Sequence, residues 1–269
     1  MMNYEELCNE TIEIARNAGK YIYAEHGKHD FDDIKSKGKH NFVTEVDRGS
    51  EKQIVAALQR LIPEAGFITE EGTSNKKGKR FNWIIDPLDG TTNFIHDAPP
   101  VAVSIALMEN EEIVIGVVNE IFLGECFYAW KGGPAFMNGK KVYVSQAKSV
   151  SDSLIATGFP YHNFDRLKPF MQSLEYFFNH THGVRRLGSA ATDLAYVACG
   201  RYDAFYEYNL SPWDLAAGTF LIQQAGGKST DFTGGTDYLF GKELVAANNH
   251  VFSEFLEVVG RFMNKQKKQ

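Results

Sequence analysis

Cysteine is scarce in this sequence. The 269 residues contain three cysteines, Cys8, Cys126 and Cys199, and no two of them form a Cys-x-x-Cys pair. An odd number of widely spaced cysteines suits neither a disulfide framework nor a structural zinc site. The pattern therefore argues against a disulfide-stapled fold and against the zinc-finger classes.

Long apolar runs are also absent. Stretches such as Val101 to Met108 are far shorter than the roughly 20 residues that span a bilayer. The first residues, Met1 to Glu6, are acidic and lack the basic and then apolar pattern of a signal peptide. We therefore expect a cytoplasmic protein with no membrane partner.

Several catalytic signatures are missing as well. The sequence has no His-Glu-x-x-His motif, no Walker sequence and no Gly-x-Ser-x-Gly nucleophile elbow. Basic residues are outnumbered by acidic ones, and the formal net charge is −6. A net acidic chain is a poor electrostatic partner for nucleic acid, so we do not expect nucleic acid among its partners.

What remains is an ordinary globular composition, with 43% hydrophobic and 23% charged residues. Apolar spacing predicts helices over residues 3–22 and 48–62, and then a mostly antiparallel sheet over residues 66–145. Asn138-Gly139 is typical of a type I′ hairpin turn, here between strands at 136–137 and 142–144.

The second half alternates between the two kinds of element. Strands are predicted at 154–157, 184–187, 202–206 and 244–247, with helices at 166–179, 190–199, 212–225 and from residue 251. An antiparallel sheet followed by a mixed sheet with interleaved helices predicts an α+β fold of layered sheets and helices. We divide it into subdomains at 1–147 and 148–269, packed as one body.

The stretch from Trp83 to Phe94, which reads WIIDPLDGTTNF, carries the strongest chemical signal. Asp86 follows an apolar strand, and Pro87 and Gly90 predict a tight turn beside Asp89. Two carboxylates and backbone carbonyls within four residues form a hard-oxygen ligand set, which suits Mg²⁺ or Mn²⁺ better than zinc.

Three further acids join this set, although each also has a plain structural reading. Glu70 can be a solvated strand end, Asp214 can stabilise a helix dipole, and Asp47 can be a helix N-cap. Packed together without cations, these carboxylates would repel strongly. Two or three divalent ions would remove that repulsion and make a phosphate group welcome.

The sequence resembles the inositol monophosphatase family, in particular its bacterial branch, from about residue 4 to residue 262. The resemblance implies a layered α-β-α-β-α sandwich and a homodimer. It rests on three stretches: Trp83 to Phe94 preceded by Glu70-Glu71, Arg185 to Asp203, and Ser211 to Gly218 followed by Gln224 to Gly227.

The resemblance also implies metal ligands, each at a position that matches a family motif. Glu70, Asp86 and the carbonyl of Leu88 would hold one Mg²⁺. Asp86, Asp89 and Asp214 would hold a second ion, and Glu70 would help to hold a weaker third.

Catalytic and substrate-binding roles follow from the same resemblance. Catalysis is implied for Glu70, Thr91 and Asp47, with Thr91 hydrogen-bonded to Asp47 and orienting the attacking water. Substrate contacts are implied for Asp89, Gly90, Thr91, Gly188, Ser189, Ala190 and Glu207.

These features predict Mg²⁺-dependent hydrolysis of a small polyol phosphate, above all inositol monophosphate, by a metal-activated water. The alternatives with the same fold are phosphatases for histidinol phosphate, fructose bisphosphate or a bisphosphate nucleotide. A rival from another class is a non-catalytic role in RNA or transcription, for which only Arg185-Arg186 and the basic tail at 265–269 offer support.

Overall fold

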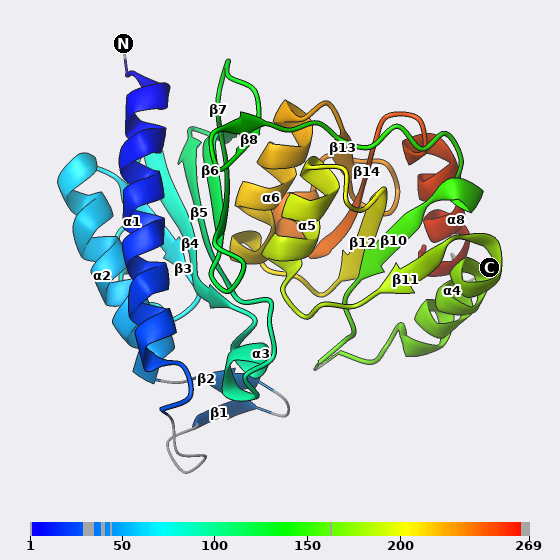
Figure 1. Ribbon diagram of the computed structural model, residues 1–269, viewed down its shortest axis with the longest axis horizontal. Coiled ribbons are helices and arrows are strands. Elements are labelled where there is room, and N and C mark those ends of the chain that lie inside the picture. The colour runs from blue at the N-terminus through cyan, green and yellow to red at the C-terminus, as the bar shows by residue number, and fades with distance from the viewer. Residues whose placement is uncertain (1, 29–34, 39–40, 44, 162, 265–269) are drawn as a thin grey trace.

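The computed structural model describes residues 2–28, 35–38, 41–43, 45–161 and 163–264. Its helices and two main sheets stack in the order α-β-α-β-α, as the resemblance implies (Figure 1). One outer layer is α1 (Tyr4–Glu25) with α2 (Glu45–Leu61), the middle layer is α5 (Ala190–Ala198) with α6 (Pro212–Gln224), and the other outer layer is α4 (Leu167–His180) with α8 (Phe252–Met263).

The first sheet has seven strands in sequence order, and all neighbours pair antiparallel except the first two, which run parallel. The predicted antiparallel sheet is therefore confirmed. Its strands are β3 (Gly66–Thr69), β4 (Phe81–Asp89), β5 (Ala102–Glu109), β6 (Glu112–Glu120), β7 (Glu125–Trp130), β8 (Phe136–Met137) and β9 (Lys140–Lys141).

The second sheet has five strands and is mixed, as predicted. Its order is β11 (Gly183–Arg185), β10 (Leu154–Thr157), β12 (Ala204–Tyr208), β14 (Glu243–Ala247) and β13 (Lys228–Thr230). The strand β10 runs parallel to both of its neighbours, and the remaining pairs are antiparallel. A separate two-stranded sheet pairs β1 (Lys35–Gly38) with β2 (Asn41–Val43).

The apolar core consists of three clusters, one between the two sheets and one between each sheet and its outer helices. One cluster of buried side chains lies between the two sheets and includes Phe127, Leu194, Phe205 and Phe220 from the facing strands and the two middle helices. Burying a large apolar side chain contributes about 2–3 kcal/mol, so this shared cluster ties the two halves together. The boundary at residues 147 and 148 falls in the segment between β9 and β10, and the division into two subdomains stays a prediction.

Several local predictions need correction. The helix expected from residue 48 begins at Glu45, and the strand expected at 184–187 is β11, which ends at Arg185. The strand expected at 142–144 is replaced by β9, because the amide of Val144 bonds to the carbonyl of Ala225 beyond α6 and the chain has left the sheet. The strand expected to end at Asp86 continues to Asp89. The strand expected at 202–206 lies two residues later, at 204–208.

Several short elements were not expected from the sequence. They are β1, β2, β13, α3 (Thr91–Ile95), α7 (Tyr238–Gly241) and a 3-10 turn (Val150–Asp152). The predicted hairpin turn is present, with positive φ angles of 48° at Asn138 and 82° at Gly139. In the ranges described here, no helix is both long enough and apolar enough to cross a membrane.

Candidate metal centre and substrate pocket

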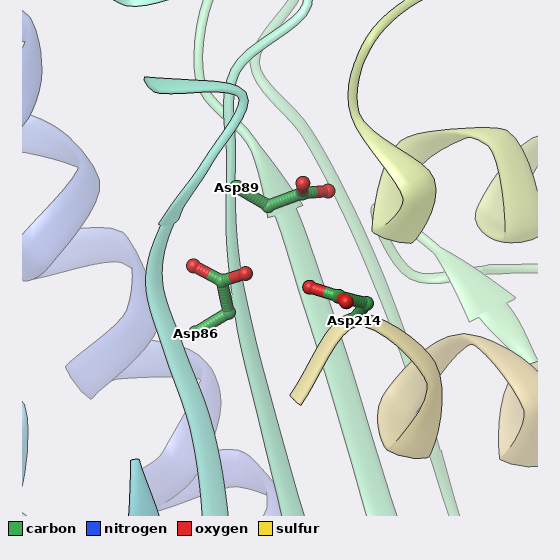
Figure 2. Close-up of side chains that lie close together, drawn as sticks. All are labelled: Asp86, Asp89 and Asp214. Carbon is green, nitrogen blue, oxygen red and sulfur yellow. The ribbon is translucent and has the colours of Figure 1, made fainter. Parts of the chain in front are cut away.

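Three aspartates converge from two different elements. Asp86 and Asp89 lie on β4, and Asp214 lies in the first turn of α6. One carboxylate oxygen from each residue lies within 4.8 Å of the others. Figure 2 shows the three carboxylates gathered around one space. The structure thus brings together three of the predicted metal ligands.

An irregularity in β4 explains how Asp86 and Asp89 reach the same space. Residues three positions apart on a regular strand point to opposite faces of the sheet. The pairing of β4 with β5 shifts register between Asp86 and Asp89, and Pro87 in between has no amide to donate. The amide of Leu88 instead donates to Asp86 Oδ1 at 3.0 Å, which fixes the turn around that carboxylate.

Asp214 is placed by the start of α6. Pro212 occupies the first turn, and the amide of Ser211 donates to Asp214 Oδ2 at 2.7 Å. Asp214 therefore also has a structural role, since its carboxylate accepts a capping hydrogen bond at the start of α6. The capping bond also holds it beside Asp86 and Asp89.

Asp89 is held by the other half of the chain. The hydroxyl of Ser189 donates to Asp89 Oδ2 at 2.6 Å, and the amide of Ala191 donates to the same oxygen at 2.7 Å. Both donors lie at the start of α5. These two bonds join the strand that carries two aspartates to the middle helical layer.

Burial raises the pKa of each of these acids, and repulsion from neighbouring carboxyl groups adds to this for Asp86 and Asp214. Burial raises the pKa of Asp86 well above its ordinary value, and Glu70, Asp89 and Asp214 raise it further. Burial raises the pKa of Asp214 to about 7 and that of Asp89 to about 6, the latter despite its bonds from Ser189 and Ala191. A cation between these carboxylates would relieve the repulsion. The all-oxygen donor set fits a hard divalent ion such as Mg²⁺.

A hydroxyl and a further carboxylate stand beside the cluster. Thr91 Oγ1 lies 2.9 Å from Asp47 Oδ1 and 3.2 Å from the carbonyl oxygen of Leu88. Asp47 is buried in the first turn of α2 and is therefore not the N-cap of that helix. Glu70 follows β3 directly and lines the same pocket as Asp89 and Thr91.

The pocket above the cluster has a volume of about 220 Å³. That is below the roughly 300–1,000 Å³ of sites for drug-sized ligands, and it suits a small metabolite. The predicted substrate-binding residues all line it: Asp89, Gly90, Thr91, Gly188, Ser189, Ala190 and Glu207. The structure thus brings every predicted site residue into one region, while the roles of these residues stay predictions.

Four residues with contacts in this region were missed. Arg186 and Asp193 line the pocket. Ser50 and Glu51, one turn after Asp47, are buried and bond to the segments that carry the metal ligands. The sequence could have predicted the burial of Ser50 and Glu51, because positions 47, 50 and 51 lie on the same helix face as Ile54 and Leu58. Polar residues on a buried helix face need partners.

The comparison with known families decides what kind of protein this is. The sequence profile of the inositol monophosphatase family matches residues 3–260. The chain belongs to this family. The membership and fold predicted from the sequence are therefore confirmed, and so is the prediction of an enzyme of the phosphatase class.

Individual relatives agree with this assignment. The chain is 40% identical over 260 residues to a Nus factor SuhB of Pseudomonas aeruginosa, covering 95% of this chain and 96% of the relative. It is 39% identical over 256 residues to an inositol-1-monophosphatase of Rhizobium meliloti, again covering 95% and 96%. The crystal structure of the extragenic suppressor protein suhB from Bartonella henselae superposes with a TM-score of 0.89 at 36% identity, covering 94% of this chain and 98% of that one.

Family membership and the carboxylate cluster together fit a metal-dependent phosphatase. The names of the relatives fall into two groups, because some are called phosphatases and others Nus factors. The family assignment therefore leaves the substrate to be argued from the site itself.

Proposed function

We propose that this enzyme hydrolyses a small polyol phosphate monoester, with inositol monophosphate as its main substrate, and that it requires Mg²⁺. The observation that carries the proposal is the position of the aspartate cluster. Asp89 and Asp214 lie in the same small pocket as Glu207, whose carboxyl can accept hydrogen bonds from substrate hydroxyls. One pocket thus contains carboxylates that can bind cations and a carboxyl group that can accept hydrogen bonds from an alcohol.

Each protein group has a definable task in this reaction. Glu70, Asp86, Asp89, Asp214 and the Leu88 carbonyl would hold two or three Mg²⁺ ions. These ions would supply charge neutralisation for the phosphate and for the leaving alkoxide. The amides of Gly90 and Thr91 would bind the phosphate oxygens.

The attacking water would be oriented by Thr91. Its hydroxyl donates to the buried Asp47 carboxylate, so its oxygen lone pairs are left to accept a hydrogen bond from water. The oxygen of this water would then attack the phosphorus atom in line with the leaving oxygen. A P–O bond to water would form as the P–O bond to the alcohol breaks, and the chain would form no covalent intermediate. Glu70 lines the same pocket and would contribute to holding this water.

Phosphate release from a panel of substrates tests the proposal. With Mg²⁺, inositol monophosphate should be hydrolysed faster than histidinol phosphate, fructose 1,6-bisphosphate or a bisphosphate nucleotide. EDTA should abolish the activity, and Asp86→Asn should lower it by several orders of magnitude while the protein stays folded. Full activity after removal of divalent ions would refute the metal dependence, and a better turnover of another substrate would refute the substrate.

The family resemblance also supports a homodimer and a cytoplasmic location, and light scattering would test the former. A second, non-catalytic role in RNA or transcription would rest on Arg185-Arg186, on the basic tail and on the name Nus factor that the SuhB relatives carry. Arg185 is exposed, but Arg186 lines the pocket, and the tail at 265–269 lies outside the described residues. We expect no shift of structured RNA in an electrophoretic assay.

A further inference from the structure

Two ionisable side chains in the pocket have no part in the metal centre. Asp193, on α5, has an exposed fraction of 1%, and within the described residues its Oδ1 atom has no hydrogen-bond partner. Arg186 lies between β11 and α5, and its Nε atom is likewise buried without a partner there. Both residues line the pocket together with Glu207. Buried polar groups are normally hydrogen-bonded, so unused groups in a pocket wall indicate a ligand.

The backbone around these groups leaves room for them. A Cβ atom on Gly158 would lie 2.0 Å from the carboxyl of Glu207, and one on Gly188 would lie 2.6 Å from a guanidinium nitrogen of Arg186. Any larger residue at either position would therefore displace a charged group from the wall. Glu207 and Arg186 can occupy their positions only because residues 158 and 188 are glycines.

Two aromatic rings also hold the guanidinium group of Arg186 in place. Its guanidinium carbon lies 5.5 Å from the ring centre of Phe159 and 5.3 Å from that of Tyr161, both within the range of cation–π contacts. No ion pair within 4.0 Å engages this arginine among the described residues. Its position is thus set by aromatic rings, which leave its N–H groups available to a ligand.

We propose that Asp193 and Arg186 join Glu207 to form a wall that binds the hydroxyl groups of a neutral polyol and so selects the alcohol part of the substrate. This inference rests on the proposed function and makes it more specific. A hydroxyl both donates and accepts a hydrogen bond. It therefore matches a wall that offers both carboxyl oxygens and guanidinium N–H groups.

The same wall disfavours an alcohol that carries a second phosphate. That phosphate would meet two carboxyl groups for one arginine. An ammonium or imidazolium group would meet one guanidinium, and the same two carboxyl groups would offset that repulsion. The penalty on a second phosphate does not apply to a neutral polyol, so specificity against bisphosphates arises here from mismatched charge as well as from matched hydrogen bonds.

The test compares two phosphate esters that share the phosphate chemistry. We would measure kcat/KM for inositol 1-phosphate, and for p-nitrophenyl phosphate, which has no hydroxyl groups on its leaving group. Asp193→Ala and Arg186→Gln should each lower the first value about ten- to hundredfold, because each loses a hydrogen bond to a substrate hydroxyl. The second value should stay nearly unchanged. In Arg186→Gln, the ratio of histidinol phosphate to inositol phosphate turnover should also rise.

Arg185→Gln is the matched control, because Arg185 is the exposed neighbour of Arg186 and does not line the pocket. It should change neither value. Equal losses on both esters in the Asp193 and Arg186 variants, or no loss on either, would overturn the proposed wall. A wild-type enzyme that hydrolyses the aryl ester but no neutral polyol phosphate would instead refute the proposed function.

Discussion

At the scale of single residues, the hydroxyl of Thr91 carries the most specific prediction. Its hydrogen bond to Asp47 Oδ1 is 2.9 Å long and joins two elements that are 44 positions apart in the chain. Thr91→Ala should lower kcat by about a hundredfold or more, in the range expected for loss of a group that acts on the reacting water. The Mg²⁺ concentration for half-maximal activity should stay nearly the same, because Thr91 is not a metal ligand.

Thr91→Ser is the control, since it keeps the hydroxyl and loses only a methyl group. It should retain most of the activity. A loss for Thr91→Ala that fell entirely on KM would show instead that the hydroxyl binds substrate equally in the ground state and the transition state.

Residues inside compact motifs were the ones that the sequence could reveal. Asp86, Asp89 and Asp214 each lie in a string whose turn or cap chemistry is legible without a structure. The sequence did not predict a site role for Asp193 or Arg186, because ionisable residues near the start of a helix are common. Their importance comes from burial and from missing partners, which only the folded arrangement shows.

At the scale of elements, α2 positions parts of the metal site through one polar face. Asp47 accepts from Thr91, and Ser50 Oγ donates to the carbonyl of Pro87 at 3.0 Å. The carboxylate of Glu51 accepts from the amides of Glu71 and Thr73, at 2.8 Å and 2.7 Å. Glu51 thus fixes the chain directly after Glu70.

Glu51→Gln should therefore weaken metal binding without removing a ligand. A glutamine offers one carbonyl oxygen and an NH₂ group, and the NH₂ group cannot accept from the second amide. The Mg²⁺ concentration for half-maximal activity should rise about tenfold, and kcat at saturating Mg²⁺ should largely recover.

Glu45→Gln on the same helix is the matched control, because the side chain of Glu45 is 69% exposed. Its Mg²⁺ requirement should match that of the wild type. If Glu51→Gln lowered only the melting temperature and left the Mg²⁺ requirement unchanged, Glu51 would have a structural role alone.

Long periodic elements were predicted well, and short ones were not. The helix α1 has a clear cap and an apolar stripe, and Asn3 does accept from the amide of Glu6 at 3.3 Å. The helix α6 is marked at its start by Ser211 and Pro212. By contrast, α3, α7 and β13 have five residues or fewer, too short for a period to emerge. The register shift in β4 was invisible too, because it depends on the pairing with β5.

At the scale of the whole molecule, the acidic cluster links stability to both pH and Mg²⁺. A carboxyl whose pKa is raised by folding stabilises the folded state fully only below its unfolded pKa, near 4. That contribution is lost as the pH rises through about 6 for Asp89 and about 7 for Asp214. Mg²⁺ binds the deprotonated carboxylates, so it should stabilise the protein more at pH 8 than at pH 5.5.

Thermal unfolding at both pH values, with and without Mg²⁺, measures this link. At pH 8 and about 100 times the dissociation constant, Mg²⁺ should add about 2.7 kcal/mol, or roughly 5 °C in Tm. The gain should be much smaller at pH 5.5. Asp214→Asn keeps an acceptor for the Ser211 amide but loses one titrating group, so its metal-free form should be more stable than the wild type at pH 8. An equal Mg²⁺ effect at both pH values would contradict this account.

The order of the layers was available from the resemblance rather than from periodicity. Apolar patterns identified strands and helices, but the two sheets share one core through α5 and α6, and nothing in the local pattern says which faces meet. The order in which the layers pack is determined by contacts between residues far apart in the chain, such as the hydrogen bond from Ser189 to Asp89.

The residues around the pocket come from separate stretches of the chain. Residues 83–94 contain Asp86 and Asp89, whereas residues 158–161, 186–193 and 207–209 supply most of the remaining lining. In evolution, mutations in the second group can change which alcohol fits while the first group stays intact. A lineage with this fold can therefore keep one hydrolytic chemistry and acquire new substrates through three short segments of its gene.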